Sequence, residues 1–245
     1  MVTMEWGEFV YAPPAARVDD LIVPPEDEAH HLFRVRRIAA GDEVYVTDGE
    51  GMVYGCLVLP DHSLKILHEL PFFGEPVRPI LLCAAVLKGD SNREIIDAAT
   101  QLGASTIILF HGQRSEGRLR EDKLVKLRRI TVTAIKQCGR ARLPQIVLKN
   151  SLEAALASIP AGCMKFLAHP FEDMREIGTM PAATAADSSM VIVGPEGGFT
   201  DAEVDVALKA GCRPLILARR RLRAETAVAA GLTFLLTRRG EFQAP

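Results

Sequence analysis

One sequence pattern limits most strongly the folds open to this chain: from residue 80 onward, apolar runs alternate with amphipathic segments that are typical of helices. Residues 80–87 are entirely apolar, which is typical of a strand buried on both faces of a sheet. Further strands are expected at residues 106–110, 146–149, 165–168, 190–193 and 214–218. Strands that alternate with helices predict a mostly parallel sheet covered by those helices. We therefore expect an α/β fold from residue 80 onward.

Two capping boxes predict where helices of this region begin. Ser91 and Glu94 have the spacing at which each side chain can bond the backbone of the other residue, and so do Thr200 and Glu203. Gly103 would end the first of these helices, because glycine tolerates the left-handed conformation at a helix end. Two more helices are expected at residues 121–138 and 224–238.

The first seventy residues are instead rich in short strand-like segments. These segments lie at residues 42–47, 52–59 and 63–67, and Asp48-Gly49-Glu50-Gly51 is a typical hairpin loop between the first two. One helix is expected over residues 26–37. Together they predict a small β-barrel. The breaker-rich segment 70–79 is typical of a linker, so we expect domains at residues 1–72 and 77–245.

Charge and cysteine content exclude several classes of protein. The formal net charge of −2 argues against a globally basic nucleic-acid binder. The five cysteines are scattered without a Cys-x-x-Cys pair, which argues against a zinc site or a disulfide scaffold. No apolar run reaches the roughly 20 residues that a membrane span needs. We expect a cytoplasmic protein without a metal.

Basic residues are nevertheless concentrated in two stretches. Residues 114–142 contain ten Lys or Arg against three acids, and residues 213–223 contain five Arg and no acid. Such stretches can face a phosphate backbone, as in nucleic-acid-binding proteins. A solvated helix face is the alternative for the first stretch, and the sequence leaves both open.

A glycine-rich loop follows the expected strand at 190–193. Gly194-Pro195-Glu196-Gly197-Gly198 would lie at the carboxyl edge of the sheet, where open α/β folds bind ligands. A tight structural turn is the alternative, because short glycine motifs give many false positives. Arg219–Arg221 and Arg223 lie in a second loop, just before Glu225, and four charges at such a place favour an anionic ligand.

Two motifs carry a resemblance to a known family. Gly-Pro-Glu-Gly-Gly-Phe-Thr at 194–200, followed by Leu-Arg-Ala-Glu-Thr-Ala at 222–227, resembles the RsmE family, the uridine-N3 methyltransferases of small-subunit (16S) rRNA in the SPOUT superfamily. Other segments follow the family's order along nearly the whole chain: His30-His31-Leu32, Lys88-Gly89-Asp90 and Gln137-Cys138-Gly139-Arg140. Three positions depart from its common pattern: Lys136, Ala218 and Arg221.

The resemblance implies a fold, a cofactor and a partner. It implies a small N-terminal PUA-like β-barrel and a C-terminal α/β domain of the SPOUT type with a trefoil knot. It also implies S-adenosylmethionine as the cofactor, a homodimer as the assembly, and small-subunit rRNA or the assembled small subunit as the substrate.

The resemblance also implies the residues of the site. The expected cofactor-binding residues are Leu167, His169, Gly194, Pro195, Glu196, Gly197, Gly198, Leu217, Leu222, Arg223, Thr226 and Ala227. Arg223 or Arg140 would stabilise the uracil anion, and Glu196 or Glu225 would be the base. Capping of a helix N-terminus is an equal alternative for Glu225. The expected RNA-binding residues are Arg34, Arg36, Arg37, Lys88, Arg114, Lys136, Gln137 and Arg140.

Two other functions remain open at this point. The departures at Ala218 and Arg221 would suit an RNA-binding protein without catalytic activity, if they prevent cofactor binding. A related methyltransferase with another target, such as a ribose 2′-hydroxyl, is the second alternative.

Overall fold

The computed structural model describes residues 7–170 and 186–241, which fall into two compact units. The first unit takes in the described residues up to Glu75 together with Thr131–Leu143. The second unit takes in Pro76–Ile130 and the described residues from Pro144 onward. Helix α3 (Leu124–Cys138) therefore contributes residues to both units.

The first unit contains a six-stranded sheet in the order β1-β4-β5-β6-β3-β2. Strands β1 and β4 pair in parallel, and the other neighbours pair antiparallel. A helix covers part of the sheet over Glu26–His30 (α1) and continues as a π-helical turn over His31–Val35, which confirms the helix expected at 26–37. The strands are β1 (Phe9–Tyr11), β2 (Arg17–Val18), β3 (Leu21–Ile22), β4 (Glu43–Thr47), β5 (Met52–Val58) and β6 (Leu64–Pro71).

The expected hairpin between β4 and β5 is confirmed, and one carboxylate holds it together. Asp48 Oδ1 accepts hydrogen bonds from the backbone N–H groups of Glu50 at 2.7 Å, Gly51 at 3.0 Å and Met52 at 3.0 Å. Gly49 and Gly51 have φ angles of 74° and 132°, a region that favours glycine. Strand β6 runs on to Pro71, so the strand ends later than the pattern at 63–67 suggests.

The second unit contains a six-stranded sheet in the order β12-β10-β11-β7-β8-β9, and all neighbours pair in parallel. This confirms the predicted parallel sheet. Its strands are β7 (Ile80–Ala85), β8 (Ala104–Phe110), β9 (Gln145–Lys149), β10 (Cys163–Ala168), β11 (Ser188–Val193) and β12 (Arg213–Leu215). Strand β12 ends three residues before Ala218, because residues 216–218 leave the sheet and line a pocket.

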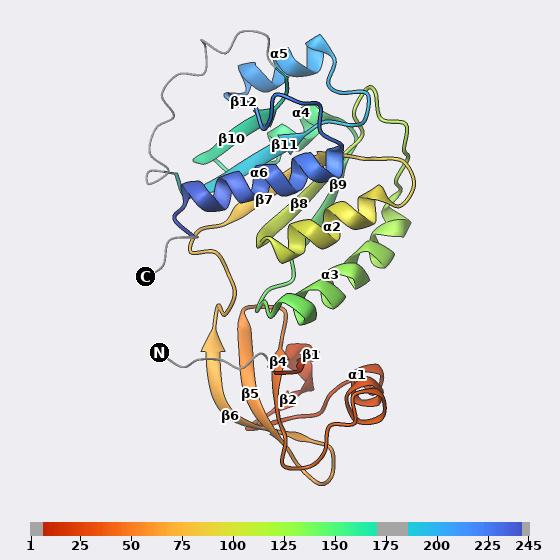
Figure 1. The fold of residues 1–245 in the computed structure, drawn as a ribbon, viewed down its shortest axis with the longest axis vertical. Coiled ribbons are helices and arrows are strands. Elements are labelled where there is room, and N and C mark those ends of the chain that lie inside the picture. The colour runs from red at the N-terminus through yellow and green to blue at the C-terminus, as the bar shows by residue number, and fades with distance from the viewer. Residues whose placement is uncertain (1–6, 171–185, 242–245) are drawn as a thin grey trace. The chain divides into compact units, whose positions relative to one another are not determined.

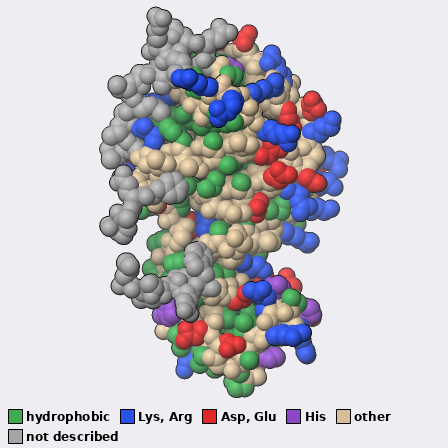
Figure 2. Space-filling model, viewed as in Figure 1, with side chains coloured by type: hydrophobic (Ala, Val, Ile, Leu, Met, Phe, Trp, Pro, Cys, Tyr) green, Lys and Arg blue, Asp and Glu red, His purple; other side chains and the backbone are tan. Residues whose placement is uncertain are grey.

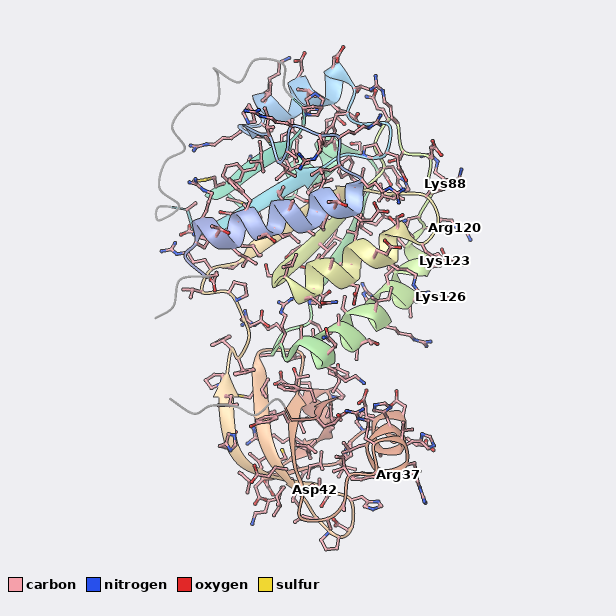
Figure 3. The ribbon with its side chains drawn as sticks, viewed as in Figure 1. Arg37, Asp42, Lys88, Arg120, Lys123 and Lys126 are labelled. Atoms are coloured by element: carbon pink, nitrogen blue, oxygen red, sulfur yellow. The ribbon has the colours of Figure 1, made fainter. Side chains whose placement is uncertain are left out.

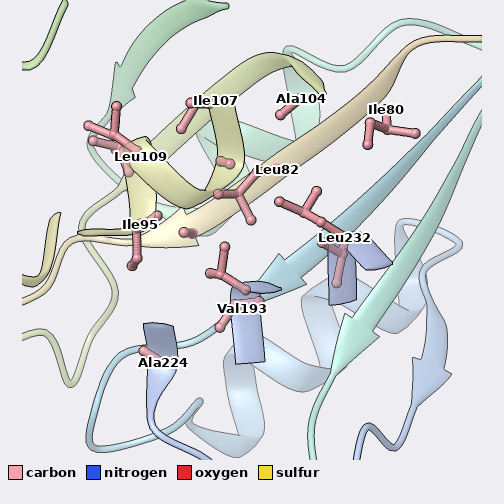
Figure 4. Packing of buried hydrophobic residues seen from close by; sticks show 14 of the residues in the cluster. Ile80, Leu82, Ile95, Ala104, Ile107, Leu109, Val193, Ala224 and Leu232 are labelled. Carbon is pink, nitrogen blue, oxygen red and sulfur yellow. The ribbon is translucent and has the colours of Figure 1, made fainter. Parts of the chain in front are cut away.

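Helices cover both faces of this sheet (Figure 1). On one face pack α2 (Ser91–Gln101), the first half of α3, and α6 (Ala224–Arg238). On the other face pack α4 (Leu152–Ala157) and α5 (Asp201–Lys209). Figure 4 shows the first of these cores, in which Ile80, Leu82 and Leu232 are fully buried. The sequence patterns did not reveal the short helix α4.

The two expected capping boxes have different outcomes. In α5 the box is confirmed, because Thr200 and Glu203 each bond the other's backbone. In α2 it is wrong, because Asp90 precedes the helix and Ser91 is its first residue. The buried Asn92 side chain holds the start of α2 instead, since it bonds both the N–H group and the carbonyl of Leu87. Among the described residues no helix is both long and apolar enough to cross a bilayer.

Replacing Gly231 by valine is expected to destabilise the second unit by about 1–3 kcal/mol, the usual cost of overpacking a core. A Cβ atom at this position of α6 would lie 2.7 Å from Cγ2 of Val191, which is fully buried in β11. Thr233→Val, on the exposed side of the same helix, is the matched control and should leave stability nearly unchanged. Urea unfolding of both variants measures the difference, and equal stability of the two would contradict this packing.

Candidate functional site

A pocket of about 850 Å³ lies at the carboxyl edge of the parallel sheet. Ala168 of β10, Val193 of β11 and Leu215 of β12 form its floor at the ends of their strands. Two loops form its walls: the glycine loop, residues 194–199, and the arginine loop, residues 216–223. Because parallel strands all end at one edge of a sheet, loops distant in sequence meet there.

The glycine loop is a tight turn with a buried aromatic residue at its end. Gly198 has a φ angle of 72°, and its N–H group donates to the carbonyl of Pro195 at 2.8 Å. Phe199 is 4% exposed and stacks on Phe110 at a centroid distance of 6.5 Å. A Cβ atom on Gly194 would lie 3.0 Å from the Phe199 ring, so a side chain there would crowd the ring.

Arginine side chains from two other segments bond carbonyl oxygens of the glycine loop. Arg221 Nη2 donates to the Glu196 carbonyl at 2.7 Å. Arg114 Nη1 donates to the carbonyls of Gly197 at 3.3 Å and Phe199 at 3.1 Å. Since Arg221 belongs to the arginine loop, its bond joins the two walls of the pocket. The arginine that departs from the family's common pattern thus has a structural partner in this chain.

His169 lies where β10 enters the pocket. Its backbone N–H group donates to the Leu215 carbonyl at 3.2 Å, and its ring meets the Phe199 ring edge-on at 6.2 Å between centroids. Burial lowers the pKa of the imidazole, and the nearby Asp201 carboxylate opposes that shift. A lowered histidine pKa favours the neutral ring at pH 7, so His169 brings no full charge to the pocket.

Most of the expected cofactor-binding residues line this one pocket. They are His169, Gly194, Pro195, Glu196, Gly197, Gly198, Leu217, Leu222, Arg223 and Ala227. Leu167 and Thr226 are not among the lining residues: Leu167 is fully buried in the core beneath, and Thr226 is exposed on α6. Ser91 and Ile216 also line the pocket, but the sequence did not single them out as cofactor-binding residues. It assigned Ile216 to an expected strand and Ser91 to an expected capping box.

Three of the four expected catalytic residues also line the pocket. Arg223 directly precedes α6, Glu225 lies in the first turn of that helix, and Glu196 lies in the glycine loop. The Glu196 carboxylate accepts a hydrogen bond from the backbone N–H group of Lys88 at 3.0 Å. The fourth residue, Arg140, does not line the pocket and belongs to the first unit.

The Arg140 guanidinium is buried in an ion pair. It is 1% exposed, and its Nε and Nη2 atoms lie 3.1 and 2.6 Å from the two carboxylate oxygens of Glu75. The Glu75 carboxylate also accepts a hydrogen bond from the backbone N–H group of Arg142 at 2.9 Å. Such a two-pronged, buried arginine–carboxylate pair is a structural feature of the first unit.

Replacing Glu75 by alanine is expected to destabilise the protein by about 3–5 kcal/mol, because Arg140 would keep a buried charge without its carboxylate. Glu69→Ala is the matched control, since its partner Arg17 is 37% exposed and surface pairs contribute about 0–1 kcal/mol. Chemical unfolding of the two variants gives the comparison. If Glu75→Ala lost no more unfolding stability than Glu69→Ala, the pair of Arg140 and Glu75 would not be structurally important.

The expected RNA-binding residues have varied surroundings. Arg34, Arg37 and Gln137 are exposed in the first unit. Arg36 pairs with Glu8 at 2.5 Å, and Lys136 pairs with the buried Glu28 at 2.6 Å. The lysine that departs from the family's pattern is therefore also matched by an acid in this chain.

Basic side chains are also frequent along one edge of the second unit. Figure 2 shows Lys and Arg side chains there with acidic ones between them, and Figure 3 places Lys88, Arg120, Lys123 and Lys126 on that edge. Lys88 pairs with Glu116 at 3.3 Å, in one of the exposed ion pairs of this edge. Exposed pairs of this kind contribute only about 0–1 kcal/mol, so they hold these side chains weakly. Among the described residues no cluster of His, Cys, Asp and Glu could hold a metal ion.

Family models match both parts of the chain. A model described as an RNA methyltransferase domain matches residues 74–236, and one described as an RNA methyltransferase PUA domain matches residues 24–66. The first match covers more than half of the chain and includes every residue of the pocket. This chain therefore belongs to the RNA methyltransferase family.

Named relatives make the family more specific. The ribosomal RNA small subunit methyltransferase E of Synechocystis is 31% identical over 82% of this chain and 67% of its own length. Its counterpart in Aquifex aeolicus is 30% identical over 90% of this chain and 96% of its own. The resemblance to the RsmE family is thus confirmed.

A solved structure agrees with the relatives. The crystal structure of a ribosomal RNA small subunit methyltransferase E from Neisseria gonorrhoeae, bound to S-adenosyl methionine, superposes with a TM-score of 0.83 at 25% identity. The match covers 94% of this chain and 97% of that one. The two-part α/β fold expected for a PUA-containing SPOUT methyltransferase is confirmed, whereas the trefoil knot stays a prediction.

Proposed function

We propose that this protein methylates N3 of a uridine in small-subunit (16S) rRNA with S-adenosylmethionine as methyl donor. The observation that carries the proposal is the coincidence of ten expected cofactor residues in one pocket at the carboxyl edge of the sheet. The names of the relatives and the bound S-adenosyl methionine in the similar crystal structure support it.

The pocket fits the cofactor in size and in the character of its walls. Its volume of about 850 Å³ lies in the range usual for small-molecule sites. Leu217, Leu222 and Ala227 offer apolar surface for an adenine ring, and the backbone at Gly194 and Gly197 offers polar groups for the ring and the ribose. Pockets of this kind are mostly apolar with a few placed polar groups.

The chain's own residues would serve the methyl transfer at the mouth of this pocket. S-adenosylmethionine, when bound, would supply an electrophilic methyl group on its sulfonium; the methyl group would pass to uracil N3, and S-adenosylhomocysteine would leave with the electrons of the broken S–CH3 bond. Because N3 loses its proton, Arg223 would stabilise the developing uracil anion, and Glu196 or Glu225 would accept the proton. Arg140 would contribute through the structure of the first unit, since it is paired with Glu75 there.

The RNA would be bound by both parts of the chain. We propose a PUA-like RNA-binding domain at residues 1–72 and a methyltransferase domain at 77–245, with Arg34, Arg36, Arg37, Lys88, Lys136 and Gln137 directed to phosphates. Unpaired RNA is the target that suits this chemistry, because its bases can be turned out of a stack. A homodimer and a cytoplasmic location, where small subunits are assembled, complete the proposal.

Titration calorimetry with S-adenosylmethionine separates this enzyme from an RNA-binding protein without activity. Saturable binding with one site per chain supports the enzyme, and no heat at high protein concentration supports the binding protein. The bond between Arg221 and the Glu196 carbonyl favours the first result, because it places this arginine on a pocket wall and does not close the pocket. Nucleoside mass spectrometry of the product separates uracil N3 from a ribose 2′-hydroxyl.

A further inference from the structure

The Arg114 side chain is directed to the cofactor loop, although its charge suggests a phosphate contact. Its Nη1 atom lies 3.3 Å from the Gly197 carbonyl oxygen and 3.1 Å from that of Phe199. One nitrogen thus bonds two carbonyls near the end of the same turn. A charged donor strengthens such bonds relative to neutral ones.

The segment that carries Arg114 is itself fixed to the start of α5. The Gln113 N–H group donates to Glu203 Oε1 at 2.9 Å, and the other oxygen of this carboxylate accepts from the Thr200 N–H group at 2.9 Å. Glu203 is 4% exposed, so one buried carboxylate closes the capping box of α5 and binds the Arg114 segment. Arg114 therefore reaches the glycine loop from a fixed position.

Close packing supports the same arrangement. A Cβ atom on Gly197 would lie 3.0 Å from the Cβ atom and 3.3 Å from the carbonyl oxygen of Arg114. Glycine at 197 thus lets the two backbones approach. With Arg221 on the Glu196 carbonyl, three carbonyl groups of the glycine loop are bonded to guanidinium groups from two other segments.

We propose that Arg114 is a positioning residue of the cofactor pocket, which holds the glycine loop in the conformation that binds S-adenosylmethionine. The inference rests on the proposed function, because it assigns the pocket to that cofactor. Without the arginine the loop would occupy its binding conformation for a smaller fraction of the time, and apparent affinity falls in proportion to that fraction.

This role differs in its consequences from two simpler ones. A guanidinium that bound the carboxylate of the cofactor directly would matter only for ligands that carry the amino-acid part. A guanidinium that bound RNA alone would leave cofactor affinity unchanged. A residue that holds the loop affects every ligand of the pocket, including one that consists of the nucleoside alone.

The test compares Arg114→Ala, Arg114→Lys and Arg118→Ala by titration calorimetry with two ligands. S-adenosylhomocysteine carries the amino-acid part, and 5′-methylthioadenosine lacks it. We expect Arg114→Ala to bind both ligands about 10-fold more weakly, as for a loop that is in its binding conformation about one tenth of the time.

The Arg114→Lys variant should recover part of the lost affinity, because lysine keeps a charged donor but not the guanidinium geometry. Arg118→Ala removes an exposed charge from the same segment and should bind as the parent does.

The results that would overturn the inference are distinct from each other. A loss confined to S-adenosylhomocysteine would make Arg114 a direct ligand of the amino-acid part. Unchanged affinity for both ligands, with weaker binding of an rRNA fragment, would make it an RNA contact. If the parent protein bound neither ligand, the proposed function itself would fail, whereas normal binding by the parent confines any failure to Arg114.

Discussion

Replacing Gly194 by valine is expected to abolish cofactor binding while the protein stays folded. A Cβ atom at this position would lie 3.0–3.2 Å from three carbons of the Phe199 ring. That ring is 4% exposed and packs on Phe110, so a shift of the ring to make room would disturb this packing. The branched side chain would therefore displace the glycine loop, and we expect affinity to fall more than about 100-fold, the equivalent of roughly 2.7 kcal/mol.

Calorimetry with S-adenosylhomocysteine measures this loss, and circular dichroism confirms that the variant is folded. Ala202→Val is the matched control, because Ala202 is exposed on α5 and does not line the pocket. A folded Gly194→Val protein that kept the parent's affinity would contradict the position of the cofactor against this loop.

Replacing Arg223 by alanine should instead leave cofactor binding nearly intact and reduce turnover about 100- to 1,000-fold, the usual cost of removing one group that stabilises an anion in a transition state. Arg223 is exposed at the wall of the pocket, directly before α6. From this position its charge can face a uracil ring beside the cofactor. Single-turnover methyl transfer under saturating cofactor measures the chemical step.

Arg223→Lys is the conservative variant in this experiment, and it should retain more activity than alanine because it keeps the positive charge. Equal losses of cofactor affinity and turnover in Arg223→Ala would place Arg223 among the residues that hold the cofactor. Unchanged turnover would remove it from the mechanism.

The parallel sheet and its pocket edge could be predicted because their signals are local. The apolar run at 80–87 and the box of Thr200 and Glu203 each act within a few residues, and the structure confirms both. The capping box at α2 was wrong although its helix begins where it was expected. Ser91 and Glu94 have the right spacing, but Asp90 precedes the helix and the buried Asn92 side chain bonds Leu87 at this end.

Contacts between residues far apart in sequence could not be predicted in this way. Arg114 bonds Phe199 across 85 positions, and Arg140 bonds Glu75 across 65. In sequence both arginines belong to one basic stretch, and net charge does not distinguish a phosphate contact from a buried partner. Only the fold brings Glu75 and the Phe199 carbonyl within reach of these side chains.

Methyl transfer to small ribosomal subunits tests the central claim most directly. Subunits from cells that lack this modification would be incubated with the protein and labelled S-adenosylmethionine, and the rRNA would be digested and analysed by nucleoside mass spectrometry. The account predicts label in 3-methyluridine and its loss in Arg223→Ala. No label in any rRNA nucleoside, although the protein binds the cofactor, would contradict it.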